Sequence, residues 1–152
     1  MRPRVAAPFA VRGVEYGGAK PLFCIPLVAA DLMQLLAQAK IAHELAADLV
    51  EWRADFNRDV TAAGFVDSSS RLRGVLKEQP IIFTLRIKAE GGAQEISQET
   101  RRACIEAVTA SGFVDIIDVE LQDKPVMAVK LERLPQNHAG RNPVCSEDNF
   151  SL

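Results

Sequence analysis

Residues 80–92 read Pro-Ile-Ile-Phe-Thr-Leu-Arg-Ile-Lys-Ala-Glu-Gly-Gly, and this stretch decides how the rest of the chain is interpreted. Its apolar start lacks polar alternation, which is typical of a strand covered on both faces. Arg86 and Glu90 come where the apolar run ends, and the glycines after Glu90 permit a tight turn or a close backbone approach. The stretch predicts a buried strand that delivers charge to its carboxyl end; a solvated loop pair is the alternative.

The same succession occurs at other points of the chain. Apolar runs begin near residues 22, 48, 80 and 113, at intervals of 26, 32 and 33 residues. Each interval holds one segment with helical periodicity, and a short hairpin is expected over residues 9–16. This rhythm predicts an α/β protein with about four parallel strand-helix repeats.

Charged residues gather at the carboxyl ends of these strands. With a period of two, Glu51, Arg53 and Asp55 point to one side of the second strand, and Asp118 and Glu120 lie two apart near the end of the fourth. Such charges are costly to bury unless they pair with one another or with a ligand.

Two architectures fit this rhythm, a doubly wound open sheet and part of an eight-stranded barrel. An open sheet usually carries a glycine-rich phosphate turn after its first strand, but residues 29–31 read Ala-Ala-Asp. Polar residues at several successive strand ends suit a barrel, whose sites lie at that face. The pattern therefore favours part of a TIM-type (β/α)8 barrel.

The helices between the strands have recognisable ends. Asp31 is the expected N-cap of the first helix, Asp67 or Ser68 of the second, and Ser97 of the third, which Gly112 ends. The residues expected on the three buried helix faces are Leu32, Leu35, Leu36, Ala39, Ala42 and Ala46, then Phe65, Ser69, Leu72 and Leu76, and finally Cys104, Ile105 and Val108.

Composition narrows the class of protein. The length of 152 residues suits one domain, and 18 Lys and Arg against 20 Asp and Glu give little support to nucleic-acid binding. Cys24, Cys104 and Cys145 are widely spaced, which favours reduced thiols in a cytoplasmic protein over a disulfide framework or a zinc site. Cys24 and Cys104 are expected in the core. We expect no membrane span.

Three motifs together resemble a known family. They occupy residues 51–55, 83–86 with 90–92, and 114–121, in an order and spacing similar to the type I 3-dehydroquinate dehydratases of the shikimate pathway. The resemblance covers roughly residues 5–121. It implies an eight-stranded α/β barrel, usually homodimeric, that dehydrates 3-dehydroquinate to 3-dehydroshikimate through a lysine imine, without metal or organic cofactor.

The resemblance also implies roles for the charged strand ends. Glu51, Arg53 and Arg86 match positions that bind hydroxyl and carboxylate groups of the substrate, for which a guanidinium fork is well suited. Glu90 matches the carboxylate that orients the catalytic histidine. Pro26 stands where the family commonly has a small polar residue.

The rest of the family's catalytic set has no clear counterpart. Residues 122–152 are expected to be a divergent, irregular tail without a fifth apolar strand. Lys124 and Lys130 do not lie at a strand end, so neither fits the imine-forming lysine. His138 lacks the Asp-Phe that should follow the catalytic histidine, and His43 is expected to be a surface or helix-packing residue.

These departures predict that the chain is a family member cut short. Residues 1–121 are expected to form a partial barrel, the first half of the TIM-type (β/α)8 barrel. This chain is expected to be weak or inactive as an enzyme on its own. A half barrel exposes strand edges and the apolar layer meant for its other half, which predicts self-association. A different class of function is a non-catalytic half barrel that binds carboxylate ligands or assembles with another half barrel. A third reading is a non-functional fragment.

Overall fold

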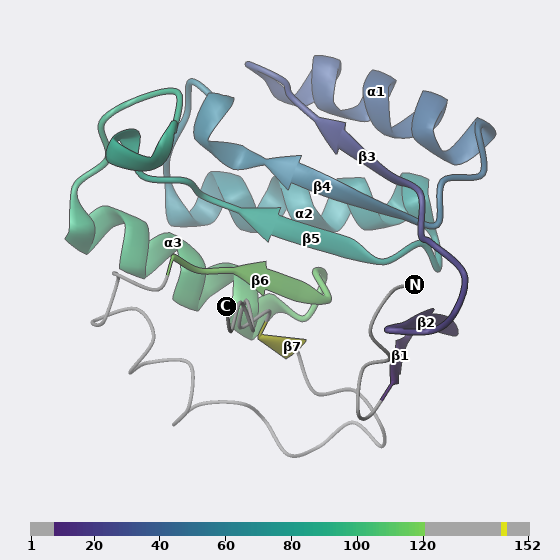
Figure 1. Cartoon of the computed structure of the whole chain (residues 1–152). Coiled ribbons are helices and arrows are strands. Elements are labelled where there is room, and N and C mark those ends of the chain that lie inside the picture. The colour runs from purple at the N-terminus through teal and green to yellow at the C-terminus, as the bar shows by residue number, and fades with distance from the viewer. Residues whose placement is uncertain (1–7, 121–143, 146–152) are drawn as a thin grey trace.

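The chain folds around one parallel sheet whose strands alternate with helices (Figure 1). The computed structural model describes residues 8–120 and 144–145. The strands of the sheet and the helices between them are β3 (Cys24–Leu27), α1 (Leu32–Glu44), β4 (Leu49–Arg53), α2 (Ala62–Leu76), β5 (Ile81–Thr84), α3 (Gln98–Ser111), β6 (Ile116–Asp118) and β7 (Val144–Cys145).

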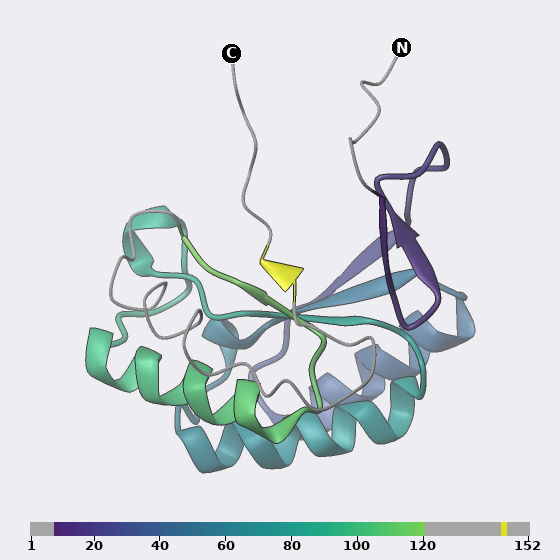
Figure 2. The same ribbon diagram turned by 90° about the horizontal axis from the view of Figure 1, so that it is seen from below.

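The sheet has the strand order of half a barrel. Its order β3-β4-β5-β6-β7 follows the sequence, and each neighbouring pair is parallel. All three helices cover the same face of the sheet, as Figure 2 shows. A doubly wound sheet would carry helices on both faces. The predicted fold, strand-helix units from a TIM-type barrel, is therefore confirmed.

The core lies between the sheet and the helices. In register across the sheet, Leu27, Trp52, Phe83 and Ile117 form one row, and each of these side chains is buried. Phe65 of α2 completes the row's packing: its ring lies 5.6 Å from both the Trp52 and the Phe83 rings, edge-on. Edge-to-face rings at this spacing attract beyond their buried area, so this cluster fixes α2 on the sheet.

The opposite face of the sheet, which we call the open face, carries the alternate residues. One row in register there is Arg53, Thr84 and Asp118, at the carboxyl ends of β4, β5 and β6. The charges thus meet at one end of the sheet, as predicted. In the preceding row of this face, Glu51 lies beside Ile82, so a charge also stands among the apolar residues there.

Most predicted helix ends are confirmed. The Asp31 side chain accepts a hydrogen bond from the Gln34 amide at 3.0 Å, and Ser97 accepts one from Thr100 at 3.1 Å. Gly112 ends α3 in the left-handed conformation, with φ +70°, which a residue without a Cβ adopts at little cost.

Two helix predictions are wrong. Helix α2 begins after Thr61, whose hydroxyl accepts from the Gly64 amide at 3.1 Å, so Asp67 and Ser68 lie inside the helix. The apolar face extends back to the fully buried Phe65, and a start at Asp67 would have left this residue outside. Ala46 lies beyond the end of α1 and has φ +53° in the turn toward β4.

The cysteine predictions divide in the same way. Cys104 is buried on the inner face of α3, as expected, but Cys24 is exposed. Cys24 occupies the open face at the amino end of β3, where no helix covers it. A continuous apolar run from residue 22 to 28 hid this difference between the two faces.

The strands are shorter than the apolar runs that predict them, and β6 covers only three residues of the run 113–121. A further strand was not expected after residue 121, but Val144–Cys145 pairs in parallel with β6. This prediction is therefore wrong for these two residues, because the outer edge of β6 offers backbone hydrogen-bonding groups that a short segment can use. The remaining residues of 122–152 lie outside the described residues.

The predicted hairpin is present and lies at the amino end of the parallel sheet (Figure 1). Its strands β1 (Phe9–Val11) and β2 (Val14–Tyr16) are antiparallel, and the Phe9 and Tyr16 rings stack at 5.1 Å. Among the described helices, none is long and apolar enough to cross a membrane.

Candidate functional site

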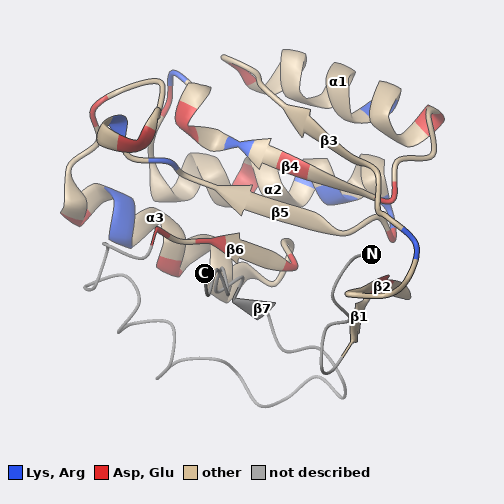
Figure 3. Cartoon of the chain, viewed as in Figure 1, with Lys and Arg blue, Asp and Glu red and all other residues tan. Residues whose placement is uncertain are grey.

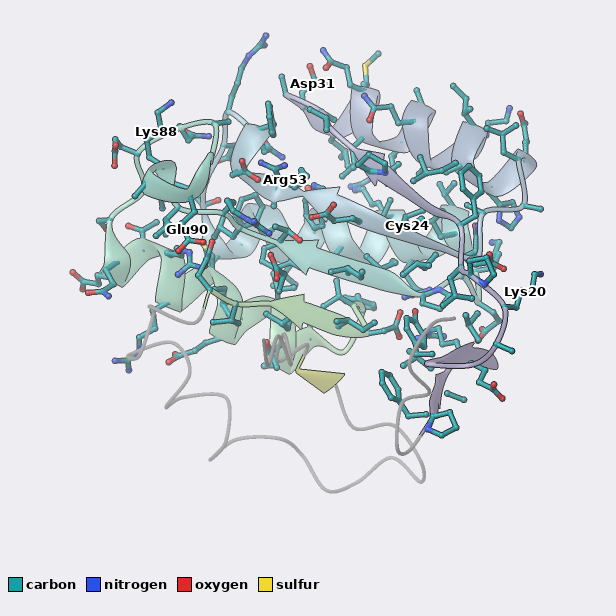
Figure 4. The ribbon with its side chains drawn as sticks, viewed as in Figure 1. Lys20, Cys24, Asp31, Arg53, Lys88 and Glu90 are labelled. Atoms are coloured by element: carbon teal, nitrogen blue, oxygen red, sulfur yellow. The ribbon has the colours of Figure 1, made fainter. Side chains whose placement is uncertain are left out.

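The predicted site residues lie at the carboxyl end of the sheet. Glu51 and Arg53 belong to β4, Arg86 follows β5, and Glu90 ends the 3-10 helix η2 (Lys88–Glu90). Figure 4 shows Arg53 and Glu90 at this end and Cys24 toward the other. In Figure 3 both signs of charge gather at the ends of β4, β5 and β6.

Arg53 is held by a carboxylate two residues away. Its Nε and Nη2 atoms each donate to Asp55 at 2.9 Å, and its guanidinium lies 5.1 Å from the centre of the Phe56 ring. The hydrogen bonds to Asp55 raise the pKa of Arg53, although burial opposes this. The fork keeps Arg53 charged and leaves its remaining donors directed away from Asp55.

Asp55 does not continue the alternation of β4, which corrects the sequence prediction. It lies in the 3-10 helix η1 (Ala54–Phe56), where its carboxylate is fully buried and turned back onto Arg53. The buried carboxylate requires partners, and Arg53 together with the Ala93 amide at 2.9 Å supplies them. Gln94 adds side-chain hydrogen bonds to the carbonyls of Asp55 and Asn57, at 2.8 and 2.7 Å. The loop after η2 is thereby tied to the end of β4.

Glu51 lies beside a neutral donor. The Thr84 hydroxyl, fully buried on the adjacent strand, donates to Glu51 Oε1 at 2.9 Å. This bond uses one carboxylate oxygen and leaves Oε2 as an acceptor on the open face.

Arg86 forms ion pairs with Asp118, the last residue of β6, and with Glu120, two residues further along the chain. Its Nη2 donates to Asp118 at 2.5 Å, and its Nε lies 3.8 Å from Glu120 Oε1. Burial opposes the charge of Arg86, but the carboxylates of Asp118 and Glu120 outweigh it and raise the pKa of Arg86. The solvated loop pair with Glu90 is therefore excluded for Arg86.

Glu90 lies on the exposed rim of the site. The turn behind it uses both glycines as predicted. Gly91 has φ +87°, and a Cβ on Gly92 would lie 2.2 Å from the Arg86 carbonyl oxygen. The backbone therefore folds tightly against Arg86, and only glycine fits at residue 92.

Sequence reasoning missed Arg101, which is 1% exposed beneath the site. Its guanidinium donates to the Leu85 carbonyl at 2.7 Å and pairs with Glu120. Burial lowers the pKa of Arg101, and the charge of Glu120 opposes this. The signal was present but was not used: residue 101 shares the helical spacing of the buried Cys104, Ile105 and Val108, which puts a charge on the inner face of the helix.

The other predicted residues lie elsewhere. His43 is on the exposed side of α1, where its Nδ1 is 2.8 Å from Gln79 Oε1, and Pro26 is exposed on β3. Lys124, Lys130 and His138 lie outside the described residues. Within 8–120 and 144–145, no group of three or more His, Cys, Asp or Glu could hold a metal ion.

Chemically, this end of the sheet offers two cationic forks and one free carboxylate edge. The side chains of Arg53 and Arg86 are 22% and 32% exposed. Partly exposed guanidinium groups that already have fixed partners are preorganised to bind a carboxylate or hydroxyl group.

Comparison with known proteins decides the family. The model of the type I 3-dehydroquinase family matches residues 23–150. The chain belongs to the type I 3-dehydroquinase family. The matched range begins after the hairpin and runs past residue 121, so it differs at both ends from the predicted 5–121.

Curated relatives of this type I 3-dehydroquinase chain carry the same description. The 3-dehydroquinate dehydratase of Bacillus licheniformis is 45% identical over 112 residues, which are 73% of this chain and 44% of the relative. That of Syntrophotalea carbinolica is 34% identical over 139 residues, 91% of this chain and 55% of the relative. The chain spans about half the length of the curated relatives it matches.

Solved structures of 3-dehydroquinate dehydratases share the fold. The protein from Geobacillus kaustophilus superposes with a TM-score of 0.79 at 32% identity and covers 83% of this chain and 50% of its own. The protein from Clostridium difficile gives a TM-score of 0.77 at 28% identity, with 80% and 49% covered. The structural match is again to half of a larger barrel.

Proposed function

We propose that the carboxyl end of this sheet is the part of a 3-dehydroquinate dehydratase site that binds the substrate's carboxylate and hydroxyl groups. The observation that carries the proposal is the convergence of Glu51, Arg53 and Arg86 at adjacent strand ends, on the face that none of the described helices covers. In barrels of this kind, sites lie at that end of the strands. The family membership supplies the substrate.

The charges of the site support an anionic ligand. Each guanidinium has a fixed carboxylate partner, so its plane is set before a ligand arrives. A ligand carboxylate then receives charge-assisted hydrogen bonds without the cost of ordering the side chain. Glu51 accepts from a ligand hydroxyl through its free oxygen.

Glu90 is proposed to orient the histidine that moves protons in intact members. Its exposed place on the rim leaves its carboxylate accessible to a ring N–H from a neighbouring element. A carboxylate in that role fixes the tautomer of the histidine.

Turnover is proposed to be weak or absent in this chain alone. The imine chemistry needs a lysine amine with a lowered pKa, and neither Lys124 nor Lys130 matches the sequence pattern of that residue. The division into a partial barrel, 1–121, and a divergent tail, 122–152, remains a prediction, as does the cytoplasmic location.

Two measurements on the purified full chain test the proposal. Calorimetry with 3-dehydroquinate should show binding that Arg86→Ala weakens and Arg71→Ala leaves unchanged; Arg71 pairs with Asp67 on an exposed helix face. Incubation with 3-dehydroquinate and borohydride, followed by mass spectrometry, should show no trapped adduct. A trapped adduct on any lysine would overturn the proposed lack of turnover, and equal affinity in both variants would overturn the site.

The second candidate function is a non-catalytic half barrel that binds carboxylates or pairs with another half barrel. The observation that favours it is the edge of the described sheet at β3, where Cys24 and Pro26 are exposed and no strand of the described part lies outside. Self-association is proposed on this basis. Sedimentation velocity would show concentration-dependent dimers; a monomer at all concentrations would contradict it.

A further inference from the structure

The peptide groups on both sides of Arg86, a predicted ligand contact, are hydrogen-bonded to buried side chains. The carbonyl of Leu85, before it, accepts a hydrogen bond from Arg101 Nε at 2.7 Å. The amide of Ile87, after it, donates to Glu120 Oε1 at 3.1 Å. Arg101 and Glu120 also pair with each other, so these two residues and the backbone around Arg86 form one closed set of contacts.

This set of contacts is buried and costly. Arg101 is 1% exposed, and the Glu120 side chain is 4% exposed. Taking both charges out of water is unfavourable, and a well-packed apolar pair is often as stable as a buried ion pair or more so. Core packing alone would not call for an ion pair at this place.

The pair also acts on the Arg86 side chain. Glu120 Oε1 lies 3.8 Å from Arg86 Nε, while Asp118 accepts from Nη2 on the other side. The Arg86 Nε atom is buried and makes no hydrogen bond to another described residue. The Arg86 guanidinium is therefore held at Nη2 by Asp118 and on its Nε side by the charge of Glu120, which in turn pairs with Arg101.

We propose that Arg101 and Glu120 form a clamp that positions Arg86, so that the guanidinium presents its open edge to a ligand. Both side chains are buried, so they act through Arg86 as positioning residues. The consequence for ligand affinity rests on the proposed function, whereas the effect on Arg86 does not.

The test separates these two parts. In the full chain, Arg101→Gln should make the Ile87 amide exchange faster by up to about tenfold, the factor that one ordinary hydrogen bond contributes. It should also shift and broaden the Arg86 Nε–H signal in NMR spectra. The affinity for 3-dehydroquinate should fall by about tenfold to a hundredfold, as expected when a hydrogen bond to a charged group is misplaced.

The matched control is Arg102→Gln on the same helix. Arg102 pairs with Glu106 on the exposed side of α3, so its loss removes a charge without touching the clamp. The Ile87 exchange rate, the Arg86 signal and the affinity should all stay as in the parent chain. Arg101→Lys keeps the charge but lacks the fork, and should recover only part of the affinity.

A further variant covers the case in which Arg101→Gln does not fold, because it leaves Glu120 buried without its main partner. The double variant Arg101→Met with Glu120→Met leaves no unpaired charge in the core. It should fold, with the same losses at Ile87 and Arg86. A folded double variant whose Ile87 exchange and Arg86 signal match the parent would overturn the clamp. If Arg86→Ala binds 3-dehydroquinate as the parent does, the proposed function fails, and the NMR measurements still decide the clamp.

Discussion

Each end of the sheet carries a cluster of arginines and carboxylates, and the two clusters differ in how far their side chains are exposed. At the amino end, Asp115 accepts from Arg12 and Arg73, at 2.5 Å each, and from the Ile81 amide at 2.9 Å. At the carboxyl end, Arg53 and Arg86 have carboxylate partners as well. The side chains of the amino-end cluster are 8 to 14% exposed, whereas those two arginines are 22 and 32% exposed.

The difference lies in how many donors are already used. Arg73 also donates to the carbonyls of Phe113, Lys77 and Gln79, at 3.0, 2.7 and 2.7 Å. The cluster of Asp115, Arg12 and Arg73 joins the hairpin and α2 to the start of β5 and β6. Few donors of the Arg73 guanidinium are left for a ligand. Arg53 and Arg86 keep accessible donors. An arginine-carboxylate cluster therefore acts as a structural pin when its donors are saturated and as a binding site when they are not.

The largest expected effect is the loss of the structural pin. Asp115→Ala leaves two largely but not fully buried guanidinium groups and one backbone amide without their shared acceptor, and should lower the free energy of unfolding by about 3 to 5 kcal/mol. Urea denaturation followed by Trp52 fluorescence measures this. Asp67→Ala, which removes an exposed i,i+4 partner of Arg71, is the control and should cost less than about 1 kcal/mol. Equal losses in both variants would mean that the amino-end cluster is not a pin.

The second effect belongs to the binding end. Arg86→Ala should weaken 3-dehydroquinate binding by about tenfold to a hundredfold, since it removes charge-assisted hydrogen bonds from a preorganised donor. Arg12→Ala removes an arginine from the other end and should leave the affinity of the folded fraction unchanged. Calorimetry of both variants makes the comparison, and a loss confined to Arg12→Ala would reverse the roles of the two ends.

The third effect is a pH dependence at the amino end. Burial raises the pKa of Tyr16 to about 12, with a further contribution from the charge of Asp115. The folded state therefore holds the phenol proton more tightly, and its stabilising effect is present in full below pH 10 and is lost as the pH rises to about 12. The loss should be less than about 2 kcal/mol, because Tyr16 is only partly buried.

Chemical denaturation between pH 9 and 12 measures this loss. The pKa of Cys24 is also raised, to about 11, by partial desolvation of its thiol and by the charge of Glu51, although the residue as a whole is exposed. The comparison is therefore made in a Cys24→Ser chain. Adding Tyr16→Phe should flatten the remaining decline. An unchanged slope would show that Tyr16 is not the group responsible.

The smallest effect is expected three residues from the largest. Asp118→Ala removes the 2.5 Å partner of Arg86, but both side chains are partly exposed, so the free energy of unfolding should fall by less than about 1 kcal/mol. The same urea measurement checks it beside Asp115→Ala. A loss as large as that of Asp115→Ala would erase the distinction between the two ends.

Local signals were sufficient for much of the fold. The N-caps at Asp31 and Ser97 and the stop at Gly112 were predicted because capping depends on residues within one helical turn. The start of α2 at Thr61 was missed because Asp67 and Ser68 have the same capping chemistry, although Phe65 was already expected on the buried face of this helix. Cys24 was placed in the core because an unbroken apolar run does not show which face a helix covers.

The site was predictable in its residues but not in its contacts. Glu51, Arg53 and Arg86 were predicted to meet because parallel strands bring their carboxyl ends together. The partners that hold them were not, since Asp55 turns back through a 3-10 helix and Arg101 comes from a helix face that was assigned only apolar residues.

The sequence by itself determined the order of strands and helices and the end of the sheet at which the charges lie, because both follow from periodicity and connection along the chain. The tertiary structure alone decided which charges pair. Arg101 meets Glu120 across 19 residues and Arg12 meets Asp115 across 103, and such pairs depend on strand register and on the seating of α3 and the hairpin. Those contacts separate the saturated cluster at one end of the sheet from the accessible one at the other.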